Sequence, residues 1–308
     1  MDKELKEASK MFRLGNLDWE LIKSQINYIY GSESKILQFT PLEYKLTNEI
    51  LIELNWIEYL NRNGFEVVEI VKSRKDNLAE EINGYTVICY ERIIGEKAGK
   101  SSWNNEFFQN LGRFTGKLHR LGKSFEEKNK YNYKNWNEIS KGRFVEYLPQ
   151  DERNLVEVCE NLIEEFSSYE INDNNYGLVH YDIHHENYYV IGSSKKIILF
   201  DFEMTCRSWY INDISIILYY ILNSTPKEEH KKISDLFLIS FFEGYRKEFS
   251  IEEKEKEKVS KFILYRDLLV YGYTFRIWKE EKNMSDMEIR FRNKLSDSIA
   301  RRMNDVIL

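Results

Sequence analysis

The stretch that decides the fold reads GLVHYDIHHENYYV at residues 177–190 and KIILFDFE at residues 196–203. An apolar strand leads into Asp182, and Asn187 follows five residues later. A short glycine-containing turn returns a second apolar strand, which ends at Asp201. The two segments therefore predict a strand–loop–strand insert that carries two carboxylates and one amide.

These three side chains form the set that phosphoryl transfer needs. One carboxylate must orient and deprotonate the attacking hydroxyl, while an amide and a second carboxylate hold Mg²⁺ on the nucleotide phosphates. The Asp-x₄-Asn spacing, followed by an Asp at a strand end, matches that arrangement. We therefore predict Asp182 as the general base and Asn187 and Asp201 as ligands of Mg²⁺, an ion that prefers hard oxygen donors.

The same residues also admit interpretations without catalysis. Asp-x₄-Asn occurs by chance in many chains, and an Asp at a strand end can merely cap a helix. A metal site made of His180, His184 and His185 is a further alternative, but no additional Cys or His partner lies nearby in the sequence to complete a zinc site. The joint pattern of strand, His-x-Asp-x-His-x-x-Asn, hairpin and strand-end Asp favours the catalytic interpretation.

Outside this insert, the chain has two parts that differ in their predicted secondary structure. The first ninety residues predict short strands around one helix, with strands at 17–23, 28–30, 35–39, 65–72 and 86–92 and the helix at 47–61. From about Asn104 the pattern is mainly helical, with helices at 104–122, at 152–166 and from Asp213 onward. The last long helix is predicted to begin at Ser250, in a capping box with Glu253. No Gly/Ser-rich linker separates the two parts, which predicts closely packed lobes.

Composition excludes several classes of function. The 308 residues include 45 Lys and Arg against 51 Asp and Glu, a formal net charge of −6. Proteins that bind a phosphate backbone through accumulated positive charge are basic, so nucleic acid is not an expected partner. The three cysteines are widely spaced and predict reduced thiols. The charged N-terminus lacks a signal-peptide core, and the longest apolar run, at 214–222, is too short to span a bilayer. We therefore expect a cytoplasmic protein without a membrane partner.

The sequence resembles the aminoglycoside phosphotransferase and choline kinase-like family, which has a bilobal protein-kinase-like fold. His180, Asp182, His184 and Asn187 fall on the catalytic-loop motif of that family, and Asp201 falls on its metal-binding aspartate. Supporting matches are GRFTGKLHRL at 112–121, YINDI at 210–214 and Gly244-Tyr245.

The resemblance implies a fold and several supporting roles. The fold is α+β, with a small strand-rich, nucleotide-binding lobe at residues 1–92 and a large, mainly helical catalytic and substrate-binding lobe at residues 93–308. His180 is implied to support the catalytic loop, and His184 either braces that loop or enters the active site. Asp213 is implied to anchor the loop through backbone hydrogen bonds, and it can also cap the helix that follows.

On the nucleotide side the sequence departs from the family pattern. The resemblance implies a strand Lys or Arg that grips the phosphates, paired with a glutamate on the next helix. Glu53 matches the glutamate, but the strand position is the neutral Gln38. Lys35 lies three residues upstream and therefore points to the opposite face of the strand. If the protein is active, another cation or an extra Mg²⁺ must compensate for Gln38.

The remaining site predictions rest on position along the chain. The segment that would join the lobes offers the nucleotide Tyr90, Arg92 and Ile94. The segment after the metal aspartate offers the acceptor Glu203, Trp209 and Tyr210. An acidic and aromatic pocket suits an amine-bearing acceptor, although core packing is the better interpretation for each aromatic residue taken singly.

The sequence thus predicts a phosphotransferase that uses ATP or GTP and Mg²⁺ to phosphorylate a hydroxyl of a small molecule, such as an aminoglycoside, an amino alcohol or a sugar. The alternative is a kinase-fold protein that binds a nucleotide or ligand with weak or no turnover, and Gln38 is its only support. An intact set of Asp182, Asn187 and Asp201 favours the enzyme, because a binding module has no need of a base and both metal ligands.

Overall fold

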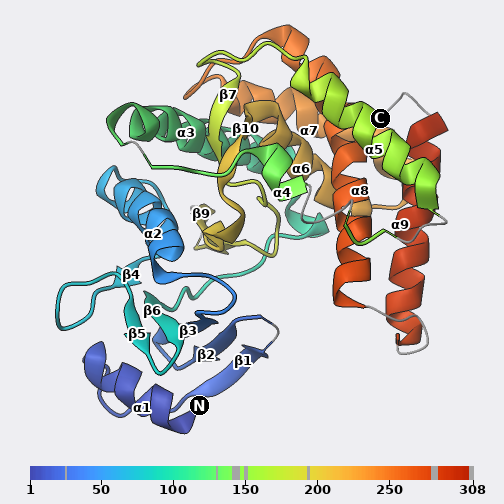
Figure 1. The fold of residues 1–308 in the computed structure, drawn as a ribbon. Coiled ribbons are helices and arrows are strands. Elements are labelled where there is room, and N and C mark those ends of the chain that lie inside the picture. Colours follow the sequence, from blue (N-terminus) through green and yellow to red (C-terminus); the bar gives the residue numbers. More distant parts are fainter. Residues whose placement is uncertain are drawn as a thin grey trace. The chain divides into compact units, whose positions relative to one another are not determined.

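The computed structural model describes residues 1–24, 26–129, 131–140, 146–148, 152–192, 195–278 and 284–304 (Figure 1). Proximity of Cα atoms divides the chain into two compact units. The sheet unit comprises Met1–Gly99 and His185–Glu203, and the helical unit comprises Lys100–His184 and Met204–Leu308. The functional division at residue 92 stays a prediction.

The sheet unit is built on an antiparallel sheet in the order β1-β2-β3-β6-β4, with β5 also paired to β6. Its strands are β1 (Glu20–Ser24), β2 (Tyr28–Gly31), β3 (Lys35–Pro41), β4 (Ile70–Val71), β5 (Glu80–Ile82) and β6 (Tyr85–Glu91). Its helices are α1 (Asp2–Met11) and α2 (Thr47–Arg62). Gln38 of β3 pairs with Ile88 of β6 in the centre of the sheet.

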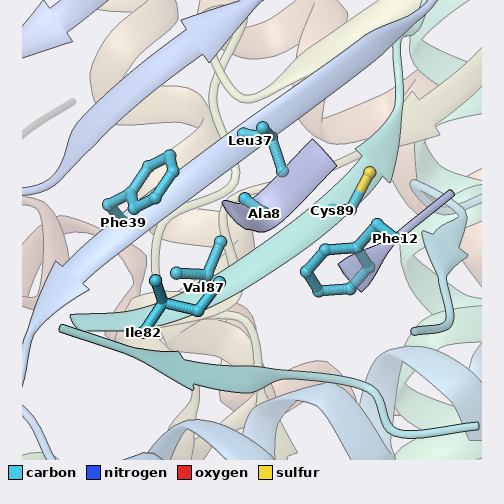
Figure 2. Close-up of a cluster of buried hydrophobic side chains, with 7 residues drawn as sticks. All are labelled: Ala8, Phe12, Leu37, Phe39, Ile82, Val87 and Cys89. Atoms are coloured by element: carbon cyan, nitrogen blue, oxygen red, sulfur yellow. The ribbon is translucent and has the colours of Figure 1, made fainter. Parts of the chain in front are cut away.

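Alternation along β3 separates two surfaces of the sheet. Leu37 and Phe39 are fully buried and pack with Ala8 and Phe12 of the N-terminal segment, in the cluster that Figure 2 shows. The cluster also contains Ile82, Val87 and Cys89. Gln38, between them in sequence, belongs to the other face of the strand. The sheet therefore has one face closed by α1 and one face available for a site.

Helix α1 corrects the expectation of one helix in this region. Leu5, Ala8 and Phe12 recur at helical spacing and pack on the sheet, although charged residues surround them. Strand β5 is also absent from the sequence prediction, and the strand expected at 65–72 is regular only at Ile70–Val71. Short elements such as these depend on pairing and packing partners that lie elsewhere in the sequence.

The predicted hairpin belongs to the sheet unit. Strand β8 (Tyr188–Ile191) pairs antiparallel with β9 (Lys196–Leu199), and residues 193–194 of its tip lie outside the described residues. The Val68 amide donates to the carbonyl oxygen of Leu199 at 2.9 Å, which attaches the hairpin to the segment after α2. Part of the segment predicted as a strand at 65–72 is therefore extended because it pairs with the hairpin at Leu199.

The helical unit contains α3 (Asn105–Lys128), α4 (Trp136–Ser140), α5 (Arg153–Ser167), α6 (Tyr210–Asn223), α7 (His230–Tyr245), α8 (Val259–Ile277) and α9 (Asp286–Asn304). Strands β7 (Tyr176–Val179) and β10 (Cys206–Trp209) form an antiparallel pair within it. Short 3₁₀ segments occur at Lys100–Ser102, Lys227–Glu229 and Glu253–Lys258, and another at Phe202–Met204 spans the boundary between the two units in sequence. Figure 1 shows α8 and α9 side by side, in orange and red.

The helical unit differs from the sequence prediction at three helix ends. Helix α3 continues past Gly122 to Lys128, and α6 begins at Tyr210, before Asp213. The predicted capped helix from Ser250 is instead a 3₁₀ segment followed by α8, with α9 as a separate helix. The predicted α+β class is confirmed. In the described part of the chain, no helix combines the length and apolar character that crossing a membrane requires.

Candidate active site

A cavity of about 480 Å³ lies within the sheet unit. The even-numbered residues of β3 line it together with α2, β6 and the segments that flank the hairpin. Seven residues predicted from the sequence are among its lining residues: Gln38, Glu53, Tyr90, Arg92, Asn187, Asp201 and Glu203. Ile94 does not line the cavity and is 77% exposed. The cavity thus gathers residues that lie far apart in the sequence.

The hairpin brings the two predicted metal ligands to the same cavity. Asn187 precedes β8 and Asp201 follows β9, and the Phe200 amide donates to the Asn187 carbonyl oxygen at 3.0 Å to close this end of the hairpin. Asp201 has a φ of 65°, a left-handed backbone conformation that costs energy in a non-glycine residue. Such conformations cluster at functional sites, where the surrounding structure enforces them.

The donor set fits a hard divalent cation. Asn187 offers an amide oxygen and Asp201 a carboxylate, and Mg²⁺ commonly binds to one or two such groups while taking its other ligands from phosphates and water. Among the described residues, no cluster of three or more His, Cys, Asp or Glu side chains could enclose a metal ion. Asn187 and Asp201 therefore suit a cation that takes its other ligands from a phosphate-bearing ligand and water.

Lys45 is a cavity residue that sequence reasoning missed. It lies between β3 and α2, lines the cavity and forms an ion pair with Glu53 of α2. Both side chains are largely buried, at 17% and 18% exposed. Burial raises the pKa of Glu53 to about 8, an effect that Lys45 opposes and that the carboxylates of Glu203 and Asp201 reinforce. The only sequence signal was a lysine two residues before the helix that carries Glu53.

Gln38 and Lys35 occupy opposite faces of β3, as strand alternation predicts. Gln38 lines the cavity, and its side-chain amide donates to the Thr40 hydroxyl at 3.3 Å. Lys35 is not among the cavity residues, and its ammonium lies 2.9 Å from a carboxylate oxygen of Glu91. Lys35 therefore pairs with Glu91, and no lysine or arginine of β3 lines the cavity.

In the helical unit, Asp182 lies between two nitrogen-containing side chains. Arg266 of α8 donates to one of its carboxylate oxygens, and the Nε2 atom of His184 lies 3.5 Å from the other. Although burial pushes the pKa of Asp182 upward, Arg266, His184 and His180 outweigh it and lower this pKa below its ordinary value. Asp182 is consequently held as a carboxylate, with 20% of its side chain exposed.

A second layer of contacts fixes these groups. Arg266 also donates to the Tyr220 hydroxyl at 2.9 Å, and the Tyr220 ring stacks on His184 with centroids 4.2 Å apart. Arg266 is only 6% exposed, so water weakens its attraction to the Asp182 carboxylate less than it would at the protein surface. Sequence patterns did not indicate that Arg266 contacts Asp182, because the two residues are 84 positions apart and lie on different elements.

Asp213 holds the chain just before Asp182. Its carboxylate accepts from the backbone amides of His180 at 3.0 Å and Tyr181 at 2.6 Å. It also lies 3.2 Å from Nε2 of the fully buried His119. The Asp182 amide in turn donates to Nδ1 of His180 at 3.3 Å. These contacts restrain residues 180–182, where Tyr181 has a left-handed φ of 67°.

The three residues predicted to bind the acceptor lie in different environments. Glu203 lines the sheet-unit cavity and accepts from the Tyr44 hydroxyl at 3.0 Å. Trp209 is 1% exposed and packs against Trp136 with ring centroids 5.2 Å apart. Tyr210 has no exposed surface and stacks on His119 at 4.7 Å. The burial of both aromatic residues favours a role in core packing.

Known proteins resemble this chain in sequence and in architecture. A family model described as phosphotransferase enzyme family matches residues 22–248. The amicoumacin kinase of Bacillus subtilis (strain 168) is 28% identical over 298 residues, covering 91% of this chain and 88% of that protein.

Solved structures agree with the sequence matches. An amicoumacin kinase in complex with AMP-PNP, Ca²⁺ and Ami matches with a TM-score of 0.87 and 27% identity, over 97% of this chain and 92% of that chain. A spectinomycin phosphotransferase in complex with ADP and spectinomycin matches with a TM-score of 0.62 over 95% of this chain and 93% of that chain. At 17% identity, the latter supports the fold alone.

Proposed function

This chain belongs to the phosphotransferase enzyme family, and we propose that it transfers the terminal phosphate of ATP or GTP to a hydroxyl group in an Mg²⁺-dependent reaction. It is a small-molecule kinase, similar to amicoumacin kinases along most of its length.

The observation that carries the proposal is the composition of the sheet-unit cavity. Asn187 and Asp201 line it together with an ion pair between Lys45 and Glu53. Two oxygen donors and a buried ammonium group are a combination that suits a metal-bound polyphosphate. Mg²⁺ held by Asn187 and Asp201 would neutralise charge on the phosphates when bound.

Asp182 is the proposed base. Its carboxylate is ionised and restrained, and it accepts the proton from the acceptor hydroxyl as the hydroxyl oxygen attacks the terminal phosphorus atom. The new phosphorus–oxygen bond forms as the bond to the bridging oxygen of the nucleotide breaks, which releases ADP or GDP. Asp213 restrains the backbone before this base, through the amides of His180 and Tyr181.

The proposed acceptor is a hydroxyl-bearing small molecule that also carries an amine. Amicoumacin is the first candidate, because kinases named for it match over 91% and 97% of this chain. Spectinomycin, choline and an amino alcohol such as aminopropanol are further candidates, since proteins that share the fold are named for them. One fold accommodates many acceptors, so a panel must decide among these compounds.

The test measures phosphate-ester formation by mass spectrometry for that panel, with Mg²⁺ and either ATP or GTP. At least one amine-bearing acceptor is expected to be phosphorylated. Asp182→Asn is expected to lower turnover about 10²- to 10⁴-fold, because the hydroxyl loses its proton acceptor. Asp235→Asn, at an exposed aspartate of α7, is the control and is expected to retain activity.

Two outcomes contradict the proposal. Unchanged turnover in Asp182→Asn would remove Asp182 from the role of base. Nucleotide binding without ester formation on any acceptor of the panel would contradict the proposed reaction and its acceptor class.

A further inference from the structure

Four basic residues of the described part of the chain line the cavity in the sheet unit: Lys23, Lys45, Arg92 and Lys97. Lys97 forms an exposed ion pair with Glu186. Arg92 donates through Nη1 to the carbonyl oxygen of Ser32. Lys23 is exposed on β1. Lys45 differs from these three, because it is largely buried and paired with the glutamate of α2.

The backbone around Lys45 is firmly attached to the two elements that it joins. The amides of Tyr44 and Lys45 donate to the Pro41 carbonyl oxygen at 3.0 and 3.2 Å, which fastens the turn to the end of β3. The Leu46 amide donates to the Glu49 carboxylate at 3.1 Å, which fastens the other end to α2. The backbone position of Lys45 is therefore set by regular structure on both sides, and the contact with Glu53 places its ammonium.

We propose that Lys45 is the phosphate-gripping cation of this enzyme and takes the role that the neutral Gln38 cannot fill. The inference rests on the proposed function, because it assigns a residue to the nucleotide phosphates. Lys45 and Gln38 line the same cavity, so a charge from the turn before α2 reaches the space that a strand lysine would serve.

The chemistry of the pair supports this role. An ammonium group is a compact point charge that binds phosphate well, and its attraction is strong where water is largely excluded. Glu53 accepts a hydrogen bond from the Lys45 ammonium and so holds the lysine in place before the nucleotide binds. Asn187 and Asp201 line the same cavity as Lys45. These two residues would hold the divalent cation, while Lys45 binds the phosphate oxygens.

The test is calorimetric titration of the full-length protein with Mg²⁺–AMP-PNP and, separately, with adenosine, which lacks phosphates. Lys45→Met is expected to weaken Mg²⁺–AMP-PNP binding about tenfold or more, the usual worth of a charge-assisted hydrogen bond, and to leave adenosine binding unchanged. Lys45→Arg is expected to retain most of the affinity. Lys45→Gln serves as a second neutral variant if Lys45→Met does not fold.

Two further variants sharpen the test. Lys72→Met removes a lysine that pairs with Glu58 of α2 at 2.8 Å outside the cavity, and it is expected to bind both ligands normally. Lys45→Met combined with Gln38→Lys returns a cation to the cavity from the strand and is expected to recover Mg²⁺–AMP-PNP affinity.

Wild-type affinity for Mg²⁺–AMP-PNP in a folded neutral variant overturns the proposal. An equal loss of adenosine binding also overturns it, because a purely structural role of Lys45 would weaken both ligands. These outcomes are separate from the proposed function, which ester formation by the wild-type protein tests. Ester formation with an unaffected Lys45 variant refutes only the lysine assignment, whereas phosphate-dependent weakening without ester formation supports it and refutes only the transfer reaction.

Discussion

At the scale of single residues, Asp182 combines two requirements that oppose each other. A base must remain ionised, yet partial burial disfavours the charge. Arg266 and His184 resolve this conflict by contacting the two carboxylate oxygens separately. Their combined effect lowers the pKa of Asp182, so its carboxylate persists to acidic pH at some cost in basicity.

Removal of Arg266 is therefore predicted to change the pH dependence of the reaction. Arg266→Met removes the largest effect that opposes burial, so the pKa of Asp182 is expected to rise. Because only the carboxylate accepts a proton, the acidic limb of the kcat/KM profile is expected to move to higher pH. A pH–rate series on the wild type and the variant measures this shift.

The control for Arg266 is Arg292→Met. Arg292 of α9 donates to the carbonyl oxygens of Thr274 at 3.2 Å and Trp278 at 3.0 Å, so its loss tests general damage to α8, the helix that carries Arg266. It is expected to lower the melting temperature without moving the acidic limb. An acidic limb that stays in place in a folded Arg266→Met protein would show that Arg266 does not act on Asp182.

The lowered pKa of Asp182 also affects the stability of the folded protein at acidic pH. A carboxylate whose pKa is lowered in the folded state stabilises the protein at pH values above the unfolded pKa. This contribution is lost as pH falls through the lowered folded pKa of Asp182. The pairing with Arg266 thus serves both the protonation state and the stability of the loop.

At the scale of elements, α3 and α7 cross at two glycines. A Cβ atom on Gly112 would lie 2.0 Å from the Phe241 carbonyl oxygen, and one on Gly244 would lie 1.8 Å from the Gln109 carbonyl oxygen. Neither distance can be relieved by a side-chain rotation, because the opposing atoms belong to the backbone. The close approach of these helices therefore requires glycine at both positions.

Gly244→Ala is accordingly predicted to destabilise the protein by about 3 kcal/mol, since the two helices must separate to admit the methyl group. Urea unfolding followed by circular dichroism measures the loss. Gly99→Ala is the matched control, because a Cβ there meets no atom within 4 Å, and its effect is expected to stay within about 0.5 kcal/mol. Equal stability of the two variants would contradict the close packing of α3 on α7.

At the scale of the whole molecule, the chain contributes two separate segments to the sheet unit. The hairpin residues His185–Glu203 join Met1–Gly99, and the sequence between them belongs to the helical unit. Asn187 and Asp201 therefore share a unit with Lys45 and Glu53, although more than a hundred residues separate them in sequence. A nucleotide that contacts all four would tie these segments together.

Nucleotide binding is thus predicted to stabilise the whole protein against heat. Mg²⁺–AMP-PNP at a hundred times its dissociation constant should add about 2.7 kcal/mol, because the ligand binds only the folded chain. A thermal shift assay measures the gain, with EDTA in place of Mg²⁺ as the first control. Asp201→Ala is the second control and is expected to lose the Mg²⁺-dependent part of the gain. The absence of any shift with ATP, GTP or AMP-PNP would contradict nucleotide binding.

The local sequence was sufficient to predict features that depend on near neighbours. Alternation along 35–39, the helical period at 47–61 and the strand–loop–strand pattern around Asp182 each produced the expected element. The α+β class, the phosphotransferase activity and the family were also within reach, because a few residue types at fixed spacing are uncommon outside this chemistry.

Features that depend on distant partners were decided only by the tertiary structure. Helix α1 is stabilised by packing on β3, Trp209 and Tyr210 are buried by helices that lie elsewhere in the sequence, and Arg266 reaches Asp182 from α8. Lys45 is the sharpest case, because nothing adjacent to it in sequence marks its entry into the cavity. Periodicity records which face of an element is apolar, whereas the pairing of charges depends on which elements the fold brings into contact.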